Sequence, residues 1–302
     1  MENVITVENL SKSFGSVKAV KNMSFSVRRG EIFGIIGPNG AGKTTTLEML
    51  EGISKPTGGT VEVLGLVPSQ QLRELNKRIG VQFQATSIQR KMKVKEALDL
   101  FASFYNESTK KEYLIERLDL DEKLNVHFED LSGGWKQRVT LALATLHSPE
   151  IVFLDEPSMG LDPHARREMW SMIRMLRDEG CTIVVTTHYM EEAEKLCDRV
   201  AMIYSGELKA LDTPAELLNN PAGHFIAFES ERVELGFVES LPEVVRVEKD
   251  EKLFKVFSEN QQETAYHLFT YCHNNDIPLS DFRFEKGSLD DLFVHYLEKE
   301  TV

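Results

Sequence analysis

The sequence predicts an α/β protein with a mostly parallel core sheet, followed by a small α+β domain. From Met1 to about Pro221, short apolar runs alternate with helical patterns, and three of these runs are almost free of polar residues before their ends. Strands of that kind are buried on both faces, as in a parallel sheet covered by helices. The composition changes after the cluster LLNNPAGH, so we place the domains at 1–221 and 222–302.

The three apolar runs of the first domain are EIFGIIG, IVFLDEP and CTIVVTTH, and each is expected to form a core strand. Between the first two, KVKEALDLFASFYNE and KKEYLIERLDL repeat apolar residues at helical spacing, which predicts a helical segment. RVAMIYSGELKALDTP predicts a hairpin that turns at Ser205 and Gly206.

The second domain is expected to run strand, helix, strand, strand, helix, strand, helix along the chain. The βαββαβ part of that order is typical of a ferredoxin-like sandwich. The expected bounds are His224–Ser230, Val233–Leu241, Val244–Lys249, Leu253–Ser258, Glu263–Asn275, Leu279–Glu285 and Leu289–Glu298.

Composition limits the possible functions. With 302 residues and 41% hydrophobic content, the chain can bury a core in each of two domains. A formal net charge of -13 argues against a broad nucleic-acid surface, so no nucleic-acid partner is expected. No apolar run approaches the roughly 18 residues of a membrane span, which predicts a soluble, cytoplasmic chain. Cys181, Cys197 and Cys272 are odd in number and lack CxxC spacing, which indicates neither a disulfide frame nor a zinc site.

The stretch GPNGAGKTTT fits the pattern GxxxxGK[ST] between an apolar strand and a helix. In this context the backbone N–H groups of the turn and the helix N-terminus surround phosphates, which predicts a phosphate-bearing ligand. Lys43 is expected to reach the outer phosphates, and Thr44 to hold Mg²⁺ through its hydroxyl. The alternative is a turn that only reverses the chain. The residues expected to contact the nucleotide here are Gly37, Pro38, Asn39, Gly40, Ala41, Gly42, Lys43, Thr44 and Thr45.

Two acids close the apolar run IVFLDEP. If its strand neighbours the phosphate turn, Asp155 becomes a second Mg²⁺ ligand, directly or through water, and Glu156 becomes the base that activates the attacking water. The alternative is that both acids only solvate a strand end.

The stretch LSGGWKQR raises the question of why a Ser and two glycines begin an apolar helix. A phosphate loop, then LSGG, then an apolar run ending in DE is the motif order of the ABC ATPases, and the whole first domain resembles their nucleotide-binding subunits. The resemblance implies a P-loop NTPase cassette with an antiparallel β-subdomain and a helical subdomain. It also implies that Ser132, Gly133 and Gly134 bind the nucleotide of a facing subunit. Because the chain carries one copy of each motif, a second cassette is expected, most simply in a homodimer.

The resemblance assigns roles to further residues. Phe14 in LSKSFGSVKAV is similar to the aromatic that stacks on adenine, with Val20 nearby, although Phe14 could also be a core aromatic. Gln84 in IGVQFQ is similar to the Q-loop glutamine, which acts in catalysis and metal binding. Gln82 points to the same side of the strand and stays an alternative.

Two more segments complete the resemblance, and one position departs from it. SMGLD, from Ser158 to Asp162, resembles the D-loop, and His188 in TTHYMEEAE resembles the switch histidine that contacts the γ-phosphate. From the residues alone, His188 could also only end a buried strand. Trp135 stands where glutamine is commonest in the family, which leaves nucleotide specificity and dimer affinity open.

The resemblance also implies a transport task. The tail GSLDDLFVHYLEKE is similar to the closing stretch of drug- and lipid-type exporters with ABC-2 permeases. We therefore expect an ATP-hydrolysing export subunit, peripheral to the cytoplasmic face of the membrane through a separate permease. The segment after Gln84, with Arg90, Lys91 and Lys93, is expected to face that permease or to form a solvated basic turn. The alternatives are a soluble ABC protein acting on ribosomes or DNA, and a regulatory module without turnover.

Overall fold

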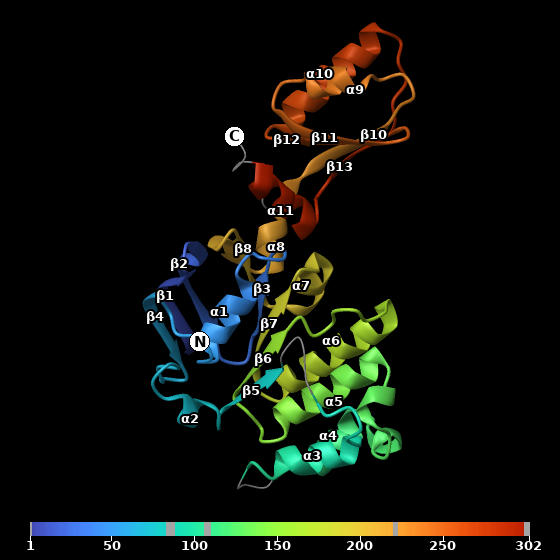
Figure 1. The fold of residues 1–302 in the computed structure, drawn as a ribbon. Helices are drawn as coiled ribbons and strands as arrows, with labels where there is room; N and C mark the ends of the chain where they lie inside the picture. The colour runs from blue at the N-terminus through green and yellow to red at the C-terminus, as the bar shows by residue number, and fades with distance from the viewer. Residues whose placement is uncertain (1, 83–87, 106–109, 220–222, 299–302) are drawn as a thin grey trace. The chain divides into compact units, whose positions relative to one another are not determined.

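The computed structural model describes residues 2–82, 88–105, 110–219 and 223–298, which form two compact units, Met1–Asp212 and Thr213–Val302 (Figure 1). The division falls before helix α8 (Pro214–Leu218) and not after residue 221, where the sequence predicted it. The reason is that α8 packs against the last helix, α11 (Leu289–Glu298), within the second unit.

The core of the first unit is a six-stranded sheet in the order β5-β6-β7-β3-β8-β9. Five of its strands are parallel, and only β9 runs antiparallel to its neighbour β8. The predicted hairpin is confirmed, because Tyr204 pairs with Glu207 across the turn. Strands β3, β6 and β7 are buried along their whole length, as the apolar runs predicted. The bounds are β3 Ile32–Ile36, β5 Ile79–Gln82, β6 Ile151–Asp155, β7 Thr182–Thr187, β8 Arg199–Tyr204 and β9 Glu207–Asp212.

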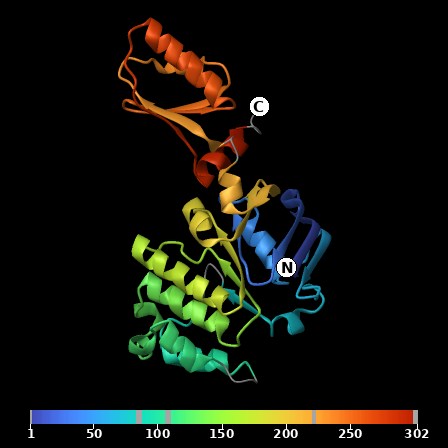
Figure 2. The ribbon, with the colours of Figure 1, turned by 180° about the vertical axis from the view of Figure 1, so that it is seen from behind.

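A three-stranded antiparallel sheet in the order β2-β1-β4 packs beside this core. Helix α1 (Lys43–Leu50) contacts strands of both sheets and so lies between them, as the two views in Figures 1 and 2 also show. One hydrophobic cluster joins α1 to the two sheets and includes the stacked rings of Phe25 and Phe33, 5.6 Å apart. The bounds are β1 Asn3–Phe14, β2 Val17–Arg28 and β4 Gly58–Val63.

Helices form the rest of the first unit. Helix α5 contacts α3, α4, α6 and strand β5, so it connects the helical part to the edge of the core sheet. The helical and antiparallel parts implied by the family resemblance are therefore both present. The bounds are α2 Leu72–Leu75, α3 Val94–Ala102, α4 Lys111–Arg117, α5 Gly133–Thr145, α6 Pro163–Asp178 and α7 Met190–Leu196, with short 3₁₀ turns at Asp121–Lys123 and Phe128–Asp130.

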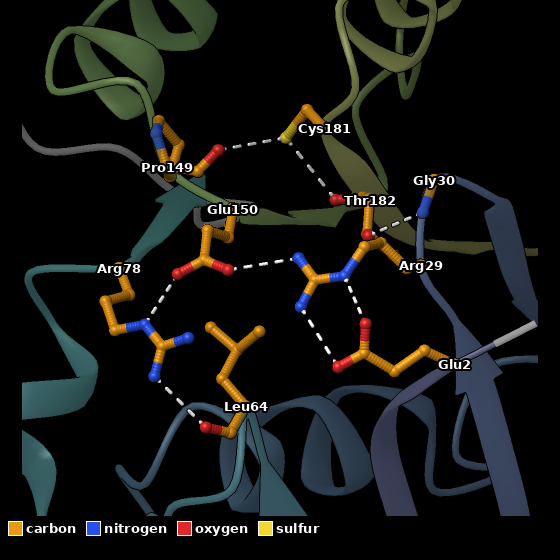
Figure 3. Close-up of polar contacts among 9 residues, drawn as sticks. All are labelled: Glu2, Arg29, Gly30, Leu64, Arg78, Pro149, Glu150, Cys181 and Thr182. Atoms are coloured by element: carbon orange, nitrogen blue, oxygen red, sulfur yellow. Dashed lines mark hydrogen bonds and ion pairs between the residues drawn. The ribbon is translucent and has the colours of Figure 1, made fainter.

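A polar network ties the two sheets together at the edge where the parallel strands begin (Figure 3). Arg29 lies 2.9 Å from Glu2 and 3.1 Å from Glu150, and Arg78 lies 2.6 Å from Glu150 while donating to the carbonyl of Leu64. The hydrogen bond from Arg78 is the main cause that holds the pKa of Glu150 below its ordinary value. Partly exposed ion pairs of this kind contribute little stability each, about 0–1 kcal/mol. This network lies at the edge where the parallel strands begin. The candidate functional residues lie at the opposite edge, where the strands end.

The second unit confirms the ferredoxin-like prediction. Its antiparallel sheet has the order β11-β12-β10-β13, and α10 packs on β10 and β12 over a separate hydrophobic cluster. At the start of α11, Asp291 accepts from the backbone N–H and hydroxyl of Ser288, while the Asp291 N–H donates back to Ser288. This reciprocal cap accounts for part of the tail motif. The bounds are β10 Phe225–Glu229, α9 Leu235–Glu239, β11 Val244–Asp250, β12 Leu253–Ser258, α10 Gln261–Asn274 and β13 Ser280–Glu285.

Candidate functional site

The phosphate loop connects β3 to α1 at the edge where the parallel strands end. Gly37 has φ 155° and Gly42 has φ 102°, and both lie against backbone. A Cβ on Gly37 would meet the carbonyl oxygen of Ile203 at 2.1 Å, and one on Gly42 would meet that of Ala19 at 2.5 Å. Only glycine tolerates both the conformation and the close approach. The loop shape thus follows directly from the two glycines.

Lys43, the first residue of α1, lies folded over this loop. Its Nζ donates to the carbonyls of Gly37 at 2.8 Å and Pro38 at 3.0 Å, and it lies 3.5 Å from Glu156 Oε1. The side chain is only 5% exposed, and this burial lowers the pKa of Lys43. A cation so placed is available to an oxygen anion that enters the loop.

Asp155 ends β6 beside the loop. The Thr44 hydroxyl donates to its carboxylate at 3.1 Å, and the hydroxyl of Thr186 on the neighbouring strand β7 also donates to it. In turn, the backbone N–H of Glu156 donates to the Thr186 hydroxyl at 3.0 Å. Thr186 therefore positions both acids, a role that the sequence prediction missed. The signal lay in its register, because Thr186 pairs with Asp155 in the parallel ladder.

Glu156 lies between two cationic or polar partners. Its Oε1 faces Lys43, and its Oε2 lies 3.1 Å from Nδ1 of His188. The backbone of Glu156 has φ 49°, a left-handed conformation that a residue with a Cβ adopts at a cost. Such strain concentrates at functional sites. The residue is only 7% exposed, and its carboxylate lies at the edge of the phosphate loop, where it can accept a proton.

Phe14 and Val20 occupy different environments. Phe14 ends β1 with 51% of its surface exposed, and the Nζ of Lys12 lies 4.9 Å from its ring centroid. Val20 is 1% exposed and packs beneath Gly42, so it supports the loop and offers almost no surface to a ligand. The exposed aliphatic neighbour of Phe14 is Val17, its partner across the β1–β2 turn. Val20, predicted to lie near the adenine, is thus buried beneath the loop, and Val17 is the exposed valine beside Phe14.

Gln84, predicted as the Q-loop glutamine, lies outside the described residues. Gln82, the alternative, ends β5 and is 3% exposed. Its Nε2 donates to Gln137 on α5, and this hydrogen bond joins the core sheet to the helical part. Gln82 therefore has a structural partner within the cassette.

The segment LSGG, which we call the signature, leads into helix α5 and supplies its first residues. Ser132 is the N-cap residue, and a Cβ on Gly133 or Gly134 would lie 3.6 Å from Leu161 or 3.3 Å from Ala165. The first distance is an ordinary van der Waals contact and the second is slightly tight, so the start of α5 lies close to the start of α6. A hollow of about 440 Å³ opens over them. None of the described residues that line this hollow comes from the loop 37–44, so the two candidate nucleotide-binding parts are separate in one chain.

Trp135 forms one wall of this hollow. Its ring lies 5.1 Å from the Lys123 Nζ and 4.6 Å from the Arg138 guanidinium, both in cation–π contact. Arg138 also pairs with Glu168 on α6 at 2.9 Å. The indole therefore holds two cations beside the signature, a role that glutamine could not fill.

Comparison with known proteins identifies the family. The profile of the ABC transporter family matches residues 20–159. The chain is 40% identical over 224 residues to the Nod factor export ATP-binding protein I of Burkholderia lata, covering 72% of this chain and 74% of that relative. It is 33% identical over 304 residues to the protein of that name from Ralstonia nicotianae, covering 98% and 94%.

Solved structures agree with this. A structure described as an ATP-binding subunit of an ABC transporter has a TM-score of 0.64 and 27% identity, covering 71% of this chain and 91% of that one. A dimeric ATP-binding cassette in a post-hydrolysis state with bound ADP and Pi has a TM-score of 0.63 and 25% identity, covering 69% and 98%. None of the helices in the described residues has the length and apolarity to span a membrane. The chain belongs to the ABC transporter family, as an ATP-binding and ATP-hydrolysing subunit.

Proposed function

We propose that two copies of this chain bind two ATP molecules head to tail and hydrolyse them to power export through a separate membrane permease. The observation that carries the proposal is the separation of the phosphate loop from the signature hollow within one chain. Each part has the chemistry for one side of a nucleotide, so a facing copy supplies what the first copy lacks. The dimeric cassette among the similar structures supports this arrangement.

The residues present fit a role for Mg²⁺. The Thr44 hydroxyl and the Asp155 carboxylate are hard oxygen donors 3.1 Å apart at the phosphate loop, as a Mg²⁺ site requires. When bound, the ion would neutralise charge on the phosphate oxygens. Thr186 would hold Asp155 in place for this task.

In hydrolysis, Glu156 would take a proton from the attacking water. Its carboxylate is fixed by Lys43 on one side and His188 on the other, so it has a defined orientation. His188 would contact the outer phosphate, and Lys43 would exchange its carbonyl partners for phosphate oxygens. From the signature, Ser132 and the amides of Gly133 and Gly134 would approach the nucleotide of the facing copy.

Export is supported by the relatives, whose names describe ATP-binding proteins for export. The permease would be a separate ABC-2-like protein, which places this chain at the cytoplasmic face of a membrane. The described segment around Arg90 and Lys91 is exposed, and the backbone N–H groups of Phe128 and Glu129 donate to its carbonyls. It offers a basic surface beside the helical part for contact with that permease.

The Glu156→Gln variant tests the proposal. It keeps the size of the side chain but removes the base, so steady-state ATPase activity should fall about 10²–10⁴-fold while ATP binding persists. Stalled hydrolysis should also trap ATP-bound dimers, which light scattering detects. The matched control is Glu62→Gln, an exposed acid on strand β4 that lines neither the phosphate loop nor the signature hollow. Unchanged turnover in Glu156→Gln, or full activity in a verified monomer, would contradict the proposal.

A further inference from the structure

A second polar hollow opens between helices α6 and α7 of the first unit. Its volume is about 340 Å³, and we name it the α6–α7 hollow. The lining residues on α6 are spaced three and four apart, so they share the face of that helix that looks toward α7. The lining includes Arg166, Arg167, Trp170 and Arg174 on α6 and Glu191 and Lys195 on α7.

The charges around this hollow are unbalanced. Among the described lining residues, three arginines and one lysine stand against a single glutamate, in a chain whose formal net charge is -13. Lys195 pairs with that glutamate, Glu191, at 2.6 Å. Arg166 and Arg167 have no carboxylate at ion-pair distance within the part of the chain that the structure describes. Neighbouring cations without a counter-charge repel one another, so an anion between them would stabilise the group.

The cationic side chains can be reached from solvent. Arg167 and Lys195 are exposed, and Arg166 and Arg174 are half-buried. Their charged groups therefore combine two properties of a binding site. They are open to an incoming ligand, and the half-buried pair is partly shielded from water, which strengthens its attraction for an anion.

Neighbouring groups hold two of these arginines in place before any ligand arrives. The guanidinium of Arg174 donates to the carbonyl of Lys195 in the last turn of α7. The guanidinium carbon of Arg166 lies 4.3 Å from the ring centroid of Tyr189, in cation–π contact. Trp170, only 4% exposed, lies at the base of the hollow. Donors fixed in this way lose little freedom when a ligand binds.

The chemistry of the hollow fits phosphate groups. A guanidinium pairs with a phosphate through two parallel hydrogen bonds. A phosphate presents three oxygens in different directions, whereas a carboxylate presents two in one plane, so phosphate better serves donors that converge from two helices. The volume lies at the lower end of the range for small-molecule sites, about 300–1,000 Å³, which leaves room for two phosphate groups.

We propose that the α6–α7 hollow binds a ligand with two phosphate groups, held by Arg166, Arg167 and Arg174. The phosphates belong either to a small soluble molecule or to the headgroup of an anionic lipid, and the test separates these sources. None of the described lining residues comes from the phosphate loop 37–44, so this is a second anion site. The inference does not depend on the proposed export function, because the site needs neither a facing copy nor a permease.

Calorimetry with inorganic diphosphate, in the absence of Mg²⁺, tests the site on the full chain. The substitution Lys43→Ala is present throughout, because it weakens binding at the phosphate loop. This chain should still bind diphosphate. Adding Arg167→Gln or Arg174→Gln should weaken the binding about tenfold or more, as expected when a charge-assisted pair is lost. Adding Arg73→Gln, an exposed arginine on α2 that does not line the hollow, should leave it unchanged.

Two further ligands define the chemistry and the source of the phosphates. Malonate, which carries two carboxylates, should bind at least about tenfold more weakly than diphosphate, because its planar groups offer fewer oxygens to the converging donors. Sedimentation with phosphatidylcholine vesicles, with or without cardiolipin, presents two phosphates in a lipid headgroup. Binding of diphosphate alone assigns a soluble ligand. Binding of cardiolipin vesicles that Arg167→Gln abolishes assigns the lipid.

Four results would overturn the inference. They are no binding of either diphosphate or cardiolipin vesicles, malonate as tight as diphosphate, binding that survives both Arg167→Gln and Arg174→Gln, and an equal loss in Arg73→Gln, which would indicate only an effect of net charge. None of these measurements involves hydrolysis or dimerisation, so failure here leaves the proposed function standing.

Discussion

Glu51 gives the stability of the first unit a pH dependence that a single substitution removes. Burial raises its pKa from an ordinary 4.5 to about 8, with the nearby charges of Asp155 and Glu48 adding to the effect. The folded state therefore binds this proton more tightly than the unfolded state does. The linked stability is present below about pH 4.5, falls as pH rises to about 8, and is constant above that.

The size of the effect follows from the same pKa. At about 1.4 kcal/mol for each pH unit, the folded state loses on the order of 5 kcal/mol between those limits. Glutamine has the shape of the protonated glutamate but does not titrate. Glu51→Gln should therefore match the wild type near pH 5 and be more stable by several kcal/mol near pH 9.

Urea unfolding followed by tryptophan fluorescence measures this directly. Both tryptophans, Trp135 and Trp170, lie in the first unit, so the signal reports that unit alone. Glu74→Gln removes an exposed acid and should shift the curve without changing its slope against pH. If the free energies of unfolding of Glu51→Gln and the wild type show the same pH dependence from pH 5 to pH 9, the Glu51 carboxyl does not have a raised pKa. The reasoning would then be wrong.

Three further substitutions probe other parts of the structure. Ser132→Phe should leave ATP binding to one chain intact but block ATP-induced dimers, because the bulky ring fills the hollow beside the signature glycines; normal dimers by light scattering would reject a role in the facing site. Phe14→Ala should weaken ATP more than tripolyphosphate, since only the nucleotide has a base to stack on the exposed ring, and equal losses in calorimetry would remove that role. Gly80→Ala should destabilise the first unit by about 1–3 kcal/mol, because the added methyl group would lie 2.0 Å from the carbonyl oxygen of Ala144; an unchanged urea midpoint would show that β5 and α5 move apart easily.

The sequence predicted those features that depend on local pattern. Apolar runs located β3, β6 and β7, and the sequence of the C-terminal part predicted the βαββαβ order of its elements. The phosphate loop could be recognised because its glycines, lysine and threonine lie within one turn. In these cases the residues that decide the structure are neighbours along the chain.

Features that depend on distant partners were missed. The position of Thr186 between two acids follows from β6 and β7 being adjacent, and no local pattern reveals that register. The burial of Val20 depends on which side of β2 faces the core, and the spacing of residues along the chain does not reveal that. The domain boundary moved because α8 finds its partner, α11, at the far end of the chain.

Lys43 shows how the phosphate loop controls its own affinity. The ammonium group already has two carbonyl oxygens and a carboxylate of its own chain as neighbours. An incoming phosphate competes with these three acceptors, so binding is an exchange whose net gain is only the difference between two sets of contacts. Binding of this moderate strength lets the product nucleotide dissociate after hydrolysis. A subunit that hydrolyses ATP in repeated cycles requires such dissociation.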